Sequence, residues 1–104
     1  MGSSLATRVA ALEARSPQHY STLRRHLPLL QTALERATRS YPTGRQLYNH
    51  LDDPPLSTRT FGRLLALLVE LKIIAFYTER SSANRYDIRE FDAATLEELN
   101  TELT

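Results

Sequence analysis

Arginine is the residue type that gives this sequence its chemistry. Twelve of the 13 basic residues are arginine, and Lys72 is the single lysine. A guanidinium group can donate two parallel hydrogen bonds to a phosphate or to the edge of a guanine. A GC-rich genome also encodes many arginines, so the composition alone leaves both interpretations open.

The spacing of these residues is more informative than their number. Ser57, Thr58, Arg59, Thr60 and Arg63 lie close together at the start of one expected helix. Hydroxyls and backbone N–H groups at a helix start can bind phosphate. Arg59 and Arg63 lie one turn apart on the expected solvent face, from which they can reach base edges. Exposed arginine pairs are usually only solvated surface, but here their position coincides with the recognition surface of the motif described below, so we predict DNA contacts.

Three further arginines lie near this helix in the sequence. Arg45 opens the preceding helix and is a predicted phosphate contact. Arg80 and Arg85 flank a polar loop and are predicted to contact the DNA backbone or the minor groove. For Arg85, pairing with Asp87 or Glu79 is an alternative.

The sequence offers little for catalysis. His19, His26 and His50 do not have the spacing of metal ligands, and there is no cysteine. The three glycines are not clustered into a phosphate-binding loop. We therefore expect no enzyme activity, no metal and no cofactor.

Charge is unevenly distributed along the chain. The net charge is +1, but residues 1–89 hold 13 basic and 7 acidic side chains, whereas residues 90–104 hold only acidic ones. We expect a basic body with an acidic last helix that points away from DNA. The absence of cysteine, of a signal-peptide pattern and of a membrane-spanning apolar run leads us to expect a cytoplasmic, nucleoid-associated protein.

Apolar periodicity predicts helices in the first half of the chain. Leucine and valine at helical spacing indicate one helix over Leu5–Arg15. A long helix is predicted over Pro17–Ser40, with a kink or restart at Pro28, where a backbone hydrogen bond is lost. A shorter helix over Gly44–Leu51, capped by Thr43, follows.

The second half continues with a helix, a hairpin and a helix. Prolines at 54 and 55 separate the short helix from one that is capped by Ser57 and runs to Leu71. A strand over 73–78 and a returning strand over 85–88 form a β-hairpin with a long tip. A last helix over Ala93–Leu103 is expected to be capped by Asp92.

This order is typical of a winged helix-turn-helix: a mainly α fold with a small β-hairpin and extra N- and C-terminal helices. We expect one structural domain, in which the N-terminal helices of residues 1–40 pack on the winged helix-turn-helix and C-terminal helix of residues 41–104. The recognition helix, residues 57–71, is expected in the major groove. The wing, residues 79–85, is expected on the backbone or in the minor groove.

Several short motifs carry a family resemblance. The segment Tyr41–Ile88, about half of the chain, contains Tyr41-Pro42-Thr43-Gly44, then Leu47-Tyr48, then Pro55-Leu56-Ser57-x-Arg59-Thr60-Phe61, then Leu64-Leu65 and Leu71-Lys72-Ile73-Ile74. Together they resemble the C-terminal winged-helix domain of archaeal origin-recognition/cell-division-control replication initiators. Lys72 stands where that family usually has glycine, and the wing lacks glycine.

The resemblance implies double-stranded DNA binding in replication-origin recognition. It assigns Ser57, Arg59, Thr60 and Arg63 to the recognition helix, and Arg80 and Arg85 to the wing. In that family an ATPase module precedes the domain, so the resemblance leaves two alternatives: a C-terminal domain whose longer parent chain supplies an ATPase module as partner, or a stand-alone relative. ATP binding is not carried over to this chain.

Two other functions remain open at this point. One is a small transcriptional regulator that forms a homodimer through Leu5–Arg15 and Ala93–Leu103. These helices can instead simply pack back on the domain. The other is a winged helix that serves protein–protein contact, which the modest net charge permits.

Overall fold

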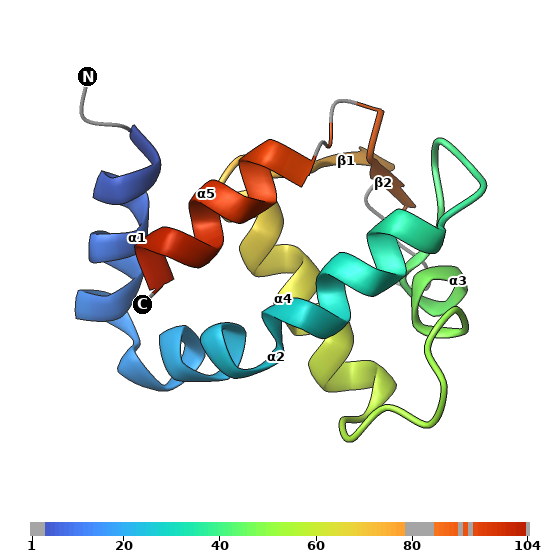
Figure 1. The fold of residues 1–104 in the computed structure, drawn as a ribbon, viewed down its shortest axis with the longest axis horizontal. Helices are drawn as coiled ribbons and strands as arrows, with labels where there is room; N and C mark the ends of the chain where they lie inside the picture. The colour runs from blue at the N-terminus through green and yellow to red at the C-terminus, as the bar shows by residue number, and fades with distance from the viewer. Residues whose placement is uncertain (1–3, 79–84, 90, 92, 104) are drawn as a thin grey trace.

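The computed structural model describes residues 4–78, 85–89, 91 and 93–103. It confirms a mainly helical fold with a small two-stranded antiparallel sheet (Figure 1). In chain order the elements are α1 (Ser4–Arg15), α2 (Pro17–Arg36), α3 (Gly44–Tyr48), α4 (Thr58–Glu70), β1 (Ala75–Thr78), β2 (Arg85–Asp87) and α5 (Ala93–Leu103). None of the described helices is long and apolar enough to cross a membrane.

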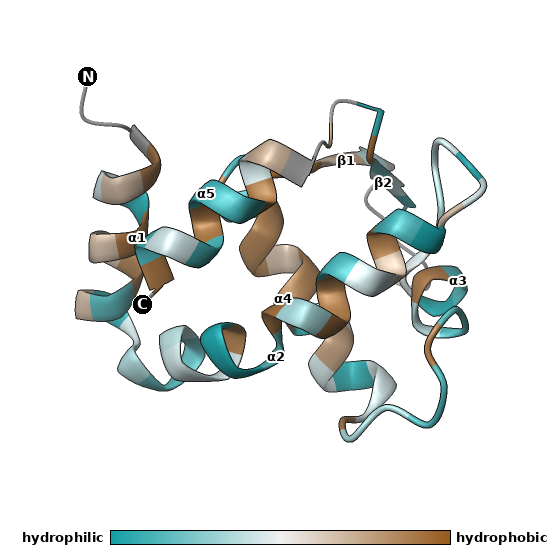
Figure 2. Cartoon of the chain, in the orientation of Figure 1, coloured by the Kyte–Doolittle hydropathy of each residue, from teal (hydrophilic) through white to brown (hydrophobic). Residues whose placement is uncertain are grey.

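Helix α4 is the centre of the apolar core. It buries a continuous face, and Leu65, Leu68 and Phe61 are fully covered. The other helices contribute leucines to the same core. Figure 2 shows the apolar colour along α4 giving way to hydrophilic colour at its N-terminal end. The core therefore holds one side of α4 along its whole length and leaves the other side of its first turns facing solvent.

Side-chain caps define three helix starts, as the sequence predicts for Thr43 and Ser57. Ser16 Oγ accepts the His19 N–H at the start of α2. Thr43 forms a reciprocal capping box with Gln46 at the start of α3. Ser57 Oγ accepts the Thr60 N–H at 3.1 Å. The expected cap Asp92 lies outside the described residues.

Helix α2 is continuous through Pro28, so the predicted restart does not occur. The Pro28 side chain is exposed, while Leu27 and Leu30 on either side of it are buried. Burial of these leucines outweighs the one hydrogen bond that proline removes. The helix ends at Arg36, earlier than the predicted Ser40, and α3 likewise ends at Tyr48 instead of Leu51.

The C-terminus of α4 is closed by a left-handed residue. Lys72 has a φ of 66°. Its N–H donates to the Val69 carbonyl, and the Ile73 N–H donates to the Leu68 carbonyl at 2.9 Å. This is the Schellman arrangement, which usually places glycine at the left-handed position. The turn uses Ile73, so β1 starts at Ala75 and not at the predicted residue 73.

A further segment of the chain lies beside the β-hairpin. β1 pairs with β2 in antiparallel register, with an irregularity between Phe76 and Thr78. On the other edge of β2, the Tyr86 N–H donates to the Pro42 carbonyl at 2.9 Å, and Thr43 forms a bridge with Arg85. The segment between α2 and α3 is thereby tied to the hairpin that follows α4.

The terminal helices pack within the chain. α1 and α5 contact each other and both contact α2. Their leucines are buried, and the Tyr20 hydroxyl donates to the Leu103 carbonyl at 3.1 Å. Arg15 at the end of α1 forms an ion pair with Glu70 at the end of α4. The apolar faces expected for a dimer are therefore covered by the chain itself.

Candidate nucleic-acid interface

The exposed face of α4 carries the two arginines predicted for DNA. Arg59 and Arg63 are exposed, as is Ala66 one turn further on. Within the described part of the chain, neither guanidinium takes part in an ion pair or a hydrogen bond. Both groups therefore keep their full set of donors for a ligand.

Small residues lie beside these arginines. A Cβ atom built on Gly62 would meet nothing within 4 Å, so open space borders the helix there. Together with Ala66, Gly62 leaves the backbone of α4 accessible from the same side as the arginines. An α-helix with such a face can approach the edges of bases closely.

The hydroxyls at the start of α4 divide into two groups. Ser57 Oγ accepts from the Thr60 backbone and also donates to Thr60 Oγ1 at 3.2 Å. These two residues therefore form the helix cap. Thr58 is exposed and lies outside this cap. Of the predicted hydroxyl contacts, Thr58 is the one with no structural role in the cap.

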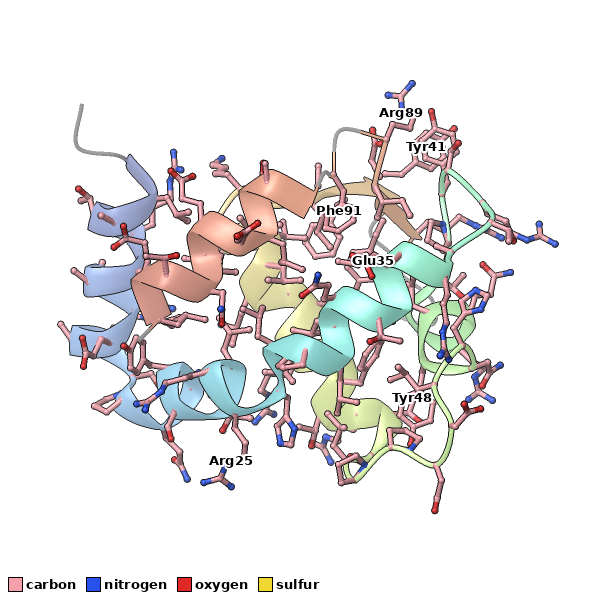
Figure 3. All side chains as sticks on the ribbon, in the orientation of Figure 1. Arg25, Glu35, Tyr41, Tyr48, Arg89 and Phe91 are labelled. Carbon is pink, nitrogen blue, oxygen red and sulfur yellow. The ribbon has the colours of Figure 1, made fainter. Side chains whose placement is uncertain are left out.

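The turn between α3 and α4 is held by Tyr48. Its hydroxyl donates to the Leu56 carbonyl at 2.8 Å, and its ring packs edge-on against Phe61, with 5.5 Å between centroids. Figure 3 shows Tyr48 beside both helices. Arg45 is exposed on α3. Because these contacts hold α3 against α4, the backbone at Arg45 has a defined position relative to the α4 face.

Of the two arginines predicted for the wing, the structure describes only Arg85. Arg80 and the rest of the loop tip, with Glu79, lie outside the described residues. Arg85 is exposed, and its Nη1 donates to the Tyr41 carbonyl at 3.0 Å. The alternative ion pair of Arg85 with Asp87 does not form, because Asp87 pairs with Arg89 instead. Arg85 thus holds the segment at Tyr41 beside β2, and the remaining N–H groups of its guanidinium are available to donate to a ligand.

A cluster at the edge of the sheet is not foreseen by the sequence patterns. The rings of Tyr41 and Tyr77 stack with 4.0 Å between centroids, and the Arg89 guanidinium lies 5.2 Å from the Tyr41 ring. Figure 3 shows Arg89 and Tyr41 together, at the opposite edge of the molecule from Arg25. Hydrogen bonds from the Arg89 side chain, and then from its backbone, hold the pKa of Asp87 below its usual value. This cluster fastens the hairpin to the segment before α3.

Residues of α2 border the α4 face, which local sequence patterns do not reveal. Gln18, His19 and Thr22 line a cavity of about 240 Å³ together with Thr60, Arg63 and Leu64 of α4. The two sides of this cavity are far apart in the sequence. No periodicity within α2 distinguishes these positions from other solvated ones.

The glutamates of α5 lie away from the start of α4, whereas Asp52 and Asp53 are exposed in the turn that precedes it. Glu97 and Glu98 are exposed on α5, which packs on α1 and α2. Figure 1 shows α5 on the other side of the molecule from the N-terminal end of α4. Glu70 is at the far end of α4 and is paired with Arg15. The exposed first turns of α4 therefore carry basic, hydroxyl and small side chains.

No protein-family model matches this chain, and neither the curated proteins nor the solved structures yielded a match.

Proposed function

We propose that this domain binds double-stranded DNA as a winged helix, with α4 as the recognition helix. The observation that carries the proposal is the exposed face of α4. It presents Arg59 and Arg63, unpaired within the described residues, next to the open space at Gly62. Such a face can enter the major groove and donate hydrogen bonds to guanine or to phosphate.

The arrangement of elements supports the winged-helix assignment. A short helix, a turn and a longer helix are followed by a β-hairpin, as in winged helix-turn-helix domains. The Pro42–Thr43 segment lies along the outer edge of β2, joined to it by the Tyr86–Pro42 hydrogen bond and the Thr43–Arg85 bridge. The wing role is assigned to the segment that joins β1 to β2, which lies outside the described residues.

The proposed contacts divide into base readout and backbone contacts. Arg59 and Arg63 reach base edges or the phosphates that border the groove. Thr58 and Arg45 contact the DNA backbone. Arg80 and Arg85 contact the DNA backbone or the minor groove at the wing. The role that the family resemblance suggests is recognition of a replication origin, with an ATPase module in a longer parent chain.

A salt-titrated binding assay tests the proposal. The double variant Arg59→Ala/Arg63→Ala is compared with the wild type on duplexes selected from random sequence. We expect at least tenfold weaker binding, and a salt slope that is smaller by about 0.9 for each phosphate that the variant no longer neutralises. Both side chains are exposed, so the fold should be retained.

The matched control is Arg8→Ala/Arg24→Ala, which removes the same charge from α1 and α2. It should change the affinity far less than the α4 double variant. If the α4 double variant binds duplex with unchanged affinity and unchanged salt slope, α4 is not the recognition helix. The interpretation as a protein–protein contact module would then be preferred.

A further inference from the structure

The cavity between α2 and α4 has a lining suited to an anion. Its polar side chains are an amide (Gln18), an imidazole (His19), two hydroxyls (Thr22 and Thr60) and a guanidinium (Arg63). Among the described residues, no carboxylate lines it. Each of these groups can donate a hydrogen bond, and oxyanions are bound in proteins by convergent donors of this kind.

Not all of these donors are equally available. The Thr22 hydroxyl donates to the Gln18 carbonyl at 2.9 Å, so it serves the helix. Thr60 Oγ1 accepts from Ser57, which leaves its own proton available. The side chains of Gln18, His19 and Arg63 make no hydrogen bond or ion pair within the described residues. Three side chains and one hydroxyl proton are therefore available to donate to a ligand in the cavity.

Both walls of the cavity are rigidly placed. The start of α2 is fixed by the Ser16 cap, and Leu23 in the next turn is fully buried. On the other wall, Leu64 is buried in the core while Thr60 is held by the Ser57 cap. Donors on such supports lose little freedom when a ligand binds. At about 240 Å³ the cavity has room for a phosphate group.

Arg63 belongs to both this cavity and the exposed face of α4. We propose that the cavity holds one backbone phosphate of the DNA strand that runs beside α4, so that α2 positions the recognition helix in the groove. This inference rests on the proposed function. It assigns to Gln18 and His19 a contact with the sugar-phosphate backbone, which carries no sequence information of its own.

The test introduces a carboxylate into the cavity with the variant Gln18→Glu. Gln18 is exposed in the first turn of α2, where the helix dipole favours a negative charge, so the fold should not be weakened. We expect duplex affinity to fall by roughly three- to tenfold, by the same factor for selected and unselected sequences, because the carboxylate repels the phosphate. The converse variant, Gln18→Arg, should bind more tightly, with a salt slope that is steeper by about one.

The matched control is Asn100→Asp, which makes the same amide-to-carboxylate change on the exposed side of α5. It should alter duplex affinity by less than about twofold. If Gln18→Glu behaves like this control while Arg59→Ala/Arg63→Ala still weakens binding, the phosphate site is refuted and the proposed function stands. If the arginine variant also binds normally, the proposed function itself fails.

Discussion

At the scale of single residues, no packing contact in the fold requires glycine at position 62. Glycine in the interior of a helix costs about 0.5–1 kcal/mol relative to alanine. Many such glycines are required because a neighbouring chain lies too close for a Cβ atom. At Gly62 a built Cβ meets nothing within 4 Å, so the fold has room for alanine. A ligand that approaches the backbone of α4 would account for the glycine.

The variant Gly62→Ala separates folding from binding. We expect the free energy of unfolding to rise by about 0.5–1 kcal/mol, because alanine is the better helix former and no clash opposes it. Duplex affinity should fall, because the added methyl group projects toward the DNA. Denaturant titration and a binding assay measure the two effects.

The control for this pair of effects is Asn100→Ala, at an exposed position within α5. It should stabilise the protein modestly and leave DNA binding unchanged. A Gly62→Ala protein that is more stable and binds duplex as tightly as the wild type would show that nothing approaches α4 closely at this point.

At the scale of single elements, the end of α4 carries a conformational cost. Lys72 adopts the left-handed conformation, with a φ of 66°. This conformation costs a non-glycine residue about 1–2 kcal/mol. The two hydrogen bonds of the Schellman turn and the burial of Ile73 maintain it.

The variant Lys72→Gly should therefore stabilise the protein. Relief of the left-handed strain exceeds the extra entropy that glycine loses on folding, and we expect a gain of about 0.5–1 kcal/mol in the free energy of unfolding. Lys72→Ala removes the same side chain but keeps the strain, so it should bring no such gain. Equal stabilities of the glycine and alanine variants in urea would contradict this account.

The elements that the sequence predicts well are those whose signals are local. Thr43 and Ser57 are hydroxyl residues directly before an apolar periodic segment, and both are found as caps. The buried and exposed faces of α4 also follow from periodicity alone, so the Arg59 and Arg63 positions could be predicted.

The features that the sequence does not predict depend on distant partners. Pro28 is accommodated because leucines on both sides of it are buried against other helices. The partner of Glu70 is Arg15, 55 positions earlier, and the stack of Tyr41 with Tyr77 joins two segments. The α2 wall of the cavity cannot be predicted for the same reason, because only the fold brings it beside α4.

At the scale of the whole molecule, the domain has two dissimilar sides. The start of α4 presents basic and small residues, whereas exposed glutamates lie on α5 across the molecule. If the proposed function holds, this distribution of charge favours approach of DNA to the first side. The leucines of α1 and α5 are buried within the chain, so these apolar faces are not available for the homodimer that the sequence suggested.

The central claim is that the face of α4 is the surface that meets duplex DNA, and a titration of the ¹⁵N-labelled domain followed by NMR tests it most directly. We expect the largest amide shifts from Ser57 to Ala66, with a second group at Gln18 and His19. The amides of α5 should stay nearly unchanged, and added salt should reverse the shifts. Shifts confined to α1 and α5, or no shifts at concentrations where duplex binding is otherwise measured, would contradict the claim.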